Sequence, residues 1–187
     1  MVIIQTLLLV SLILDQEMPQ HLLKKNNYAK SSVYNNLSQL YCTHYNILPG
    51  GSKHNLERSI HYLNKALSIN ERKRFGHKYA SSLSKLGNVY RRCAMEPMWP
   101  TTAAVCIDEA LKCHVSALEI ARTNAPYLIY LCSACETYFN MSFLYFDSGK
   151  MEEGCEFLAR SLKLLLDALS VDEIITCLLY TSPSPRD

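Results

Sequence analysis

The stretch that decides the fold covers residues 55–69 and reads NLERSIHYLNKALSI. Its apolar residues recur every three or four positions from Leu56 to Leu67, a period that places them on one face of an α-helix. Two small residues, Ser59 and Ala66, lie seven positions apart in the same stretch. Small side chains at this interval let a neighbouring helix approach closely, with ridges fitting into grooves. The stretch therefore predicts an amphipathic helix that packs tightly against a partner helix.

The same arrangement occurs twice more along the chain. Small residues again lie seven positions apart in the pairs Ala110/Ala117 and Gly154/Ser161. Upstream of each copy lies another helical segment with one small residue at its centre, and these residues are Ser38, Gly87 and Ser142. An internal repeat takes precedence over other signals because missing it misassigns the whole fold. The repeat predicts three helix pairs, over about residues 28–70, 76–123 and 127–170.

Residues that break or cap helices fall between the predicted helices. The run from Pro49 to Ser52 separates the two helices of the first pair. Thr101 and Thr102 follow two prolines in the second pair, where a threonine can cap the start of the next helix. In the third pair, Gly149 can close the first helix in a left-handed conformation. These punctuation residues agree with the boundaries that the repeat gives.

In the third copy, seven residues fall at the spacing of a known repeat motif: Tyr138, Met141, Ser142, Tyr145, Gly154, Leu158 and Ser161. Residues 28–170 therefore resemble the tetratricopeptide repeat (TPR) family. The first two copies have longer connections between their helices, and they are similar to the longer-period TPR arrays sometimes found with CHAT peptidase domains. The resemblance implies an all-α fold, a right-handed α-solenoid of antiparallel helix pairs that is truncated at the C-terminus.

Composition supports a folded helical chain with no strong electrostatic field. The 187 residues are 49% hydrophobic and 19% charged, which argues against disorder and leaves room for one domain or one block of repeats. Six glycines are few for an all-β chain with many tight turns. The formal net charge is +2, so we expect neither a nucleic-acid partner nor a membrane partner.

The cysteines indicate free thiols in a reducing compartment, and we expect the chain to be cytoplasmic. The sequence has eight cysteines, mostly within apolar helical patterns instead of loops. Cys132 and Cys135 have metal-ligand spacing, but no second pair follows at zinc-finger spacing, so core packing is the better interpretation. His114 likewise falls where the repeat places a bulky packing residue. No phosphate-binding loop or catalytic motif occurs, so the sequence predicts no cofactor, no metal and no enzymatic activity.

The two ends of the chain carry separate expectations. Residues 1–27 are interpreted as an N-terminal apolar helix, the remnant of an earlier repeat, with a signal sequence as the alternative. Residues 177–187 resemble the translation of a transposase-type sequencing adapter, which would make them an artefactual tail. Residues 171–176 would then begin a missing continuation. A solenoid without its polar cap exposes an apolar flank, so we expect self-association through the leucines of the last helix.

The resemblance to TPR proteins also implies a binding surface. The first helices of the pairs would line a concave groove, in which amide side chains can bond a peptide backbone and arginine can pair with a carboxylate. The candidate partner-binding residues are Asn35, Gln39, Ser84, Asn88, Arg91, Glu136, Phe139 and Phe143.

Two functions remain open from the sequence. The first is a non-catalytic scaffold or adaptor that binds a peptide or a helical segment of a protein partner in the groove. The alternative is the regulatory or recognition arm of a larger enzyme, whose catalytic domain is missing from this fragment.

Overall fold

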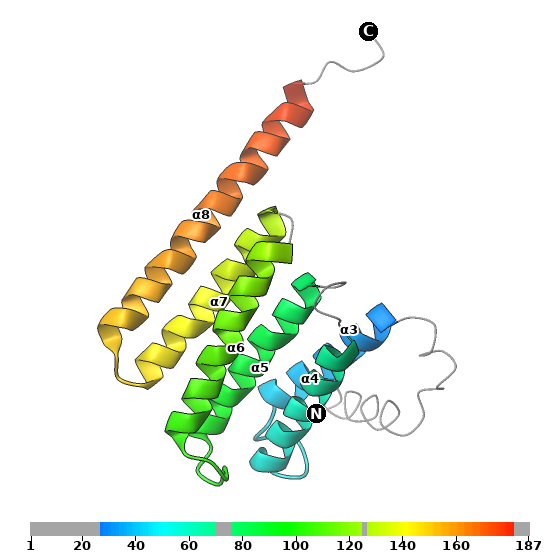
Figure 1. The fold of residues 1–187 in the computed structure, drawn as a ribbon, viewed down its shortest axis with the longest axis vertical. Coiled ribbons are helices and arrows are strands. Elements are labelled where there is room, and N and C mark those ends of the chain that lie inside the picture. The colour runs from blue at the N-terminus through cyan, green and yellow to red at the C-terminus, as the bar shows by residue number, and fades with distance from the viewer. Residues whose placement is uncertain (1–26, 70–75, 125–126, 182–187) are drawn as a thin grey trace.

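The computed structural model describes residues 27–69, 76–124 and 127–181. The predictions for residues 1–26 and 182–187 lie outside these described residues. Within them the only regular elements are α-helices, and no strand is present (Figure 1), so the all-α prediction is confirmed. The helices in chain order are α3 (Asn27–Thr43), α4 (Ser52–Ile69), α5 (Gly76–Met95), α6 (Ala103–Asn124), α7 (Tyr127–Asp147) and α8 (Met151–Thr181).

The helices associate as consecutive pairs that stack side by side. The most extensive contacts join α3 to α4, α5 to α6 and α7 to α8. Contacts of α4 with α5 and of α6 with α7 then connect one pair to the next. The first helices also meet, since α5 contacts both α3 and α7 (Figure 1). One side of the described structure is therefore formed by α3, α5 and α7.

Two buried serines bring α3 and α4 together at the centre of the first pair. The hydroxyls of Ser38 and Ser59 lie 2.8 Å apart, and the Ser59 hydroxyl also donates to the Ser38 backbone carbonyl at 2.9 Å. At the end of the pair, the buried Asn55 donates from Nδ2 to the carbonyls of Tyr45 at 3.0 Å and Leu48 at 2.9 Å. These bonds satisfy backbone groups of the connecting loop that would otherwise be buried without partners.

Glycines allow equally close contact in the other two pairs. A Cβ added to Gly87 on α5 would lie 2.7 Å from Nε2 of His114 on α6. A Cβ at Gly154 on α8 would overlap Cε1 of the Phe146 ring on α7. Any side chain at either position would displace the ring opposite, so the small residues of the repeat have the packing role that their spacing predicts.

The predicted helix ends have cap geometry. Gly149 adopts φ of 74°, and the Lys150 N–H donates to the Tyr145 carbonyl at 2.9 Å, which is the closure of a Schellman motif at the end of α7. At the start of α6, the Thr102 hydroxyl accepts from the Val105 N–H at 3.4 Å. Gly149 and Thr102 therefore cap the helix ends that the sequence predicted.

The core is a series of apolar clusters between neighbouring helices. The central cluster is formed by buried residues of α3 to α6, including Leu56, Leu63, Leu86, Val89, Cys93 and Cys106. Trp99, in the connection between α5 and α6, packs against it. The structure describes the side chains of seven of the eight cysteines; all seven are free and four are buried. Cys132 and Cys135 lie within α7, as the helical pattern predicts, but the core-packing interpretation is wrong for Cys132, which is exposed, whereas Cys135 is half-buried.

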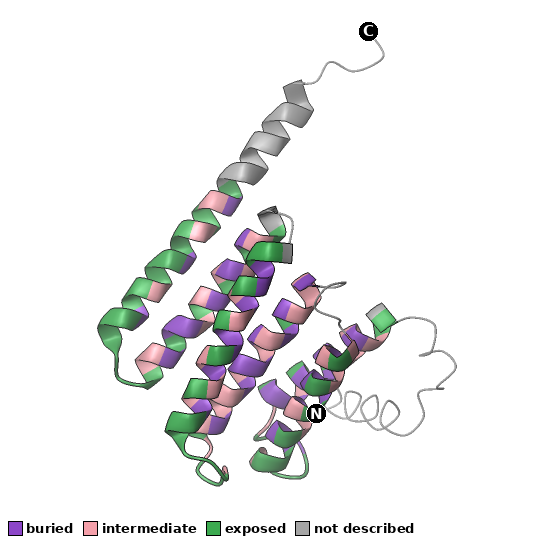
Figure 2. Cartoon of the chain, viewed as in Figure 1, coloured by how far each residue is buried: buried purple, intermediate pink, exposed green. Residues whose placement is uncertain are grey.

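Helix α8 differs from the rest of the described structure because it exposes a row of leucines. Figure 2 shows the described part of this helix mostly green, whereas more purple appears along α5, α6 and α7. The exposed residues are Leu158, Leu162, Leu165, Leu166 and Leu169, here named the leucine stripe. The apolar flank expected from the sequence is thus present. Among the described helices, none combines the length and the hydropathy needed to cross a bilayer.

Candidate functional site: a groove across α3, α5 and α7

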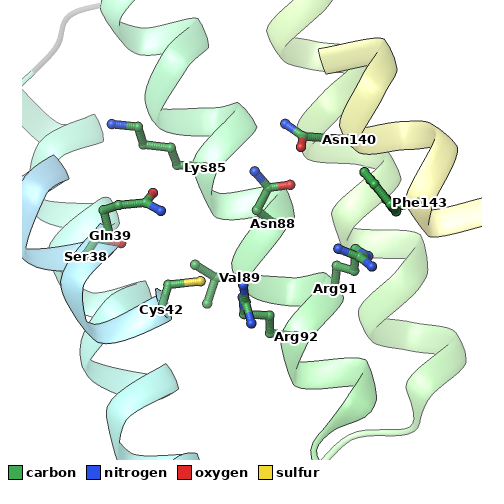
Figure 3. Close-up of a pocket in the computed structure, with 10 residues that line it drawn as sticks. All are labelled: Ser38, Gln39, Cys42, Lys85, Asn88, Val89, Arg91, Arg92, Asn140 and Phe143. Carbon is green, nitrogen blue, oxygen red and sulfur yellow. The ribbon is translucent and has the colours of Figure 1, made fainter. Parts of the chain in front are cut away.

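The first helices of the three pairs enclose one small pocket, here named the groove pocket. It measures about 150 Å³. Figure 3 shows side chains from α3 and α7 on either side of those from α5. The lining residues are Ser38, Gln39 and Cys42 from α3, Lys85, Asn88, Val89, Arg91 and Arg92 from α5, and Asn140 and Phe143 from α7.

Amides and cations dominate the lining of the groove pocket. None of its ten lining residues is a carboxylate. The amides are Gln39, Asn88 and Asn140, one from each helix, and each can donate and accept hydrogen bonds. The Asn140 Nδ2 atom is buried and has no hydrogen-bond partner among the described residues. A buried donor without a partner is costly, so a bound carbonyl or carboxylate oxygen would relieve that cost.

Arg91 is the cation that the protein already holds in place. Its Nε lies 2.5 Å from the Oδ2 of Asp147 at the end of α7. Its guanidinium carbon also lies 4.9 Å from the centre of the Phe143 ring, within the range of a cation–π contact. Phe143 in turn meets Phe139 edge-on, with 4.9 Å between the ring centres. These contacts fix α5 against α7 and form the aromatic end of the groove.

The positive charge of Lys85 is less well balanced by nearby negative charge than that of Arg91. Among the described residues it forms no ion pair within 4.0 Å. Partial burial lowers the pKa of its ammonium from the ordinary 10.5, and the negative charge of Glu136 on α7 opposes this only in part. A second anion placed in the pocket would therefore stabilise the charged form of Lys85.

Arg92 lies at the α3 side of the pocket. Its guanidinium carbon is 5.6 Å from the centre of the Tyr45 ring, and its positive charge acts on the thiol of Cys42. Burial raises the pKa of the Cys42 thiol, and the positive charge of Arg92 opposes that rise without overcoming it. Cys42 is therefore a neutral thiol at pH 7, which suits a packing role and not that of a nucleophile.

Four of the eight sequence-predicted residues line the groove pocket, namely Gln39, Asn88, Arg91 and Phe143. Two others lie on the same side of the molecule, because Phe139 contacts Phe143 and Glu136 acts electrostatically on Lys85.

The remaining two predicted residues are buried between helices. Asn35 accepts a hydrogen bond from the Ser82 hydroxyl at 3.1 Å, which links α3 to α5. Its edge reaches a second, shallower hollow of about 160 Å³ beside Lys78 and Lys85. Ser84 is only 4% exposed. The structure thus gives Asn35 and Ser84 a place in helix packing and does not bring them into the groove pocket.

The sequence analysis did not select Lys85, Arg92 or Asn140 for the site. A signal was present on α5, because residues 85, 88 and 92 are spaced three and four apart and share one helix face. Asn140 lies four residues before Leu144 on α7 and three before Phe143, so its place beside a predicted groove residue was also readable.

Comparisons with known proteins do not identify the site. No protein-family model matches the chain, and neither a curated protein nor a solved structure matches it. Within the described residues there is no group of three or more His, Cys, Asp and Glu side chains that could hold a metal ion.

Proposed function

We propose that the chain is a TPR-like α-solenoid scaffold, and that it binds an extended, acidic segment of a protein partner across α3, α5 and α7. The free thiols are in keeping with a cytoplasmic site of action, where cysteines stay reduced. The solenoid assignment draws support from the order of contacts, since each helix pair touches mainly the next pair along the chain.

The observation that carries the proposal is the concentration of amides and cations in the groove pocket, with the buried Asn140 Nδ2 left without a partner among the described residues. Three helices contribute an amide each, and α5 adds three cations, of which only Arg91 has a carboxylate partner within the described part of the chain. Oriented amides can bond the backbone of an extended segment, while Lys85 and Arg92 can each pair with a carboxylate. The net charge of the whole chain is only +2, so it does not reveal that positive charges are concentrated in this pocket.

The size of the pocket favours a peptide over a small molecule. Its volume of about 150 Å³ is below the roughly 300 Å³ at which pockets for small molecules begin. A space of this size accommodates one or two side chains of a segment whose backbone runs over the surface. The exposed rings of Phe139 and Phe143 extend the same surface beyond the pocket.

The experiment compares two pools of fluorescent peptides in a fluorescence anisotropy titration. One pool carries two adjacent glutamates at its centre among randomised positions, and the other carries glutamines in the same places. We expect the glutamate pool to bind more tightly, with an affinity that falls as salt is added. The double variant Lys85→Gln/Arg92→Gln should weaken binding by at least about tenfold, which corresponds to roughly 1.4 kcal/mol.

The matched control is Lys53→Gln, which removes an exposed cation from α4, outside the groove pocket. It should leave the affinity unchanged. Equal binding of both pools, or equal losses for Lys53→Gln and the double variant, would refute an acid-selective groove.

A further inference from the structure

The leucine stripe on α8 has the spacing of a coiled-coil seam. Leu158, Leu162, Leu165 and Leu169 follow one another at intervals of four, three and four residues. This is the 3.5-residue apolar period by which two helices pack along each other. Leu166 widens the seam on one side. The stripe is distinct from the groove pocket, none of whose lining residues lies on α8.

The side of α8 that packs within the chain is a different one. Gly154, Ser161 and Ala168 are buried at intervals of seven, and the Ser161 hydroxyl donates to the Cys135 carbonyl of α7 at 2.9 Å. The small residues therefore hold α8 on α7, and the larger leucines lie to one side of this contact and stay exposed. Leu162 is 57% exposed and Leu165 is 46% exposed.

No charged residue lies within or directly beside the leucine stripe. On an α-helix Glu156, Arg160, Lys163 and Asp167 fall on the side opposite the stripe, and the positions that flank it between Leu158 and Leu169 are Ala159, Ser161, Leu166 and Ala168. Two copies of the stripe can therefore meet without bringing like charges together. The seam itself is aliphatic throughout and is therefore complementary to itself, as a two-fold symmetric interface requires.

The area is also sufficient for a specific pairing. The exposed parts of the five leucines amount to roughly 500 Å² per copy, so a symmetric pair that covers them fully buries roughly 1,000 Å², the size at which specific interfaces begin. A contiguous apolar patch of this extent is at the upper end of what monomers expose.

We propose that the leucine stripe is a homodimer interface, in which α8 of one copy packs along α8 of a second copy. The groove pocket of each copy stays outside this interface, because it is formed by α3, α5 and α7. A dimer would therefore present two grooves to its partners, and a partner with two acidic segments would gain avidity. The pairing itself does not depend on the groove binding anything.

The test is sedimentation equilibrium of the full chain at micromolar concentrations. We expect a species of twice the 21.3 kDa of one chain. The double variant Leu162→Glu/Leu165→Glu should raise the dimer dissociation constant by at least about 100-fold while circular dichroism reports unchanged helix content. The control is Val115→Glu on α6, whose side chain has the same 46% exposure as Leu165, and which should leave the dimer intact.

A wild-type chain that sediments as a monomer would overturn the proposal. So would a dimer that survives the double variant, or one that Val115→Glu dissociates equally. A monomer that binds neutral phosphatidylcholine vesicles through the leucines would assign the stripe to a lipid surface instead, and this too would overturn it.

Discussion

At the scale of single residues, His114 shows how a polar side chain serves as packing material. It is fully buried on α6 beneath Gly87, and neither ring nitrogen has a hydrogen-bond partner among the described residues. Burial lowers the pKa of the imidazole from 6.5 to about 4, and the positive charge of Arg91 contributes to the shift. The ring is therefore neutral at pH 7, in agreement with the packing role that the repeat predicts.

This shift makes His114 a source of acid sensitivity. Between pH 6.5 and 4, the unfolded chain takes up a proton at this residue and the native chain does not. The stability it contributes is present above pH 6.5 and is lost as the pH falls towards 4, by about 3 kcal/mol in total. We expect urea unfolding of His114→Leu to show a flatter pH dependence over this window, with stability at pH 7 retained or increased. Parallel pH profiles for the variant and the wild type would contradict this account.

At the scale of elements, the close contacts of α5 with α6 and of α7 with α8 depend on glycines at the contact points. Gly154→Ala tests this directly, because the new Cβ would overlap the Phe146 ring. Alanine favours a helix over glycine by up to about 1 kcal/mol, but overpacking costs about 1–3 kcal/mol. We expect a net loss of roughly 1 kcal/mol in the free energy of unfolding. In a Phe146→Leu background the same change should become neutral or stabilising, and a stabilised single variant would contradict the close contact.

Helix identities were readable from the sequence because they follow local rules. The 3.6-residue period of residues 55–69, the seven-residue spacing of small residues and the cap at Gly149 each act within one or two helices. The length of α8 could not be predicted from these local rules. Residues 177–181, which stay predicted as part of an artefactual tail, continue α8 to Thr181, where no helix had been expected beyond residue 170. Helix propagation requires only that no breaker intervenes, and the first proline after Gly149 is Pro183.

At the scale of the whole molecule, the groove depends on how neighbouring pairs are placed, and spacing alone predicts it only in part. The motif positions selected Gln39, Asn88, Arg91 and Phe143, which do meet. Asn35 and Ser84 occupy the same position in their two helices, three residues before the central small residue, and both are buried. Whether a side chain at this position is buried depends on how closely the neighbouring helix pair packs, and the spacing within one helix does not predict that. The long side chains of Lys85 and Arg92 reach the pocket from neighbouring positions, so a fixed motif position did not identify them.

The central claim is that three first helices together bind one acidic segment. The most direct measurement is a two-dimensional ¹H–¹⁵N NMR titration of the side-chain amide groups with the glutamate-containing peptide pool. The account predicts that the NH₂ signals of Gln39, Asn88 and Asn140, one from each of α3, α5 and α7, shift together, while that of the exposed Asn64 on α4 stays fixed. Shifts confined to a single helix, or larger at Asn64 than at the groove amides, would contradict it.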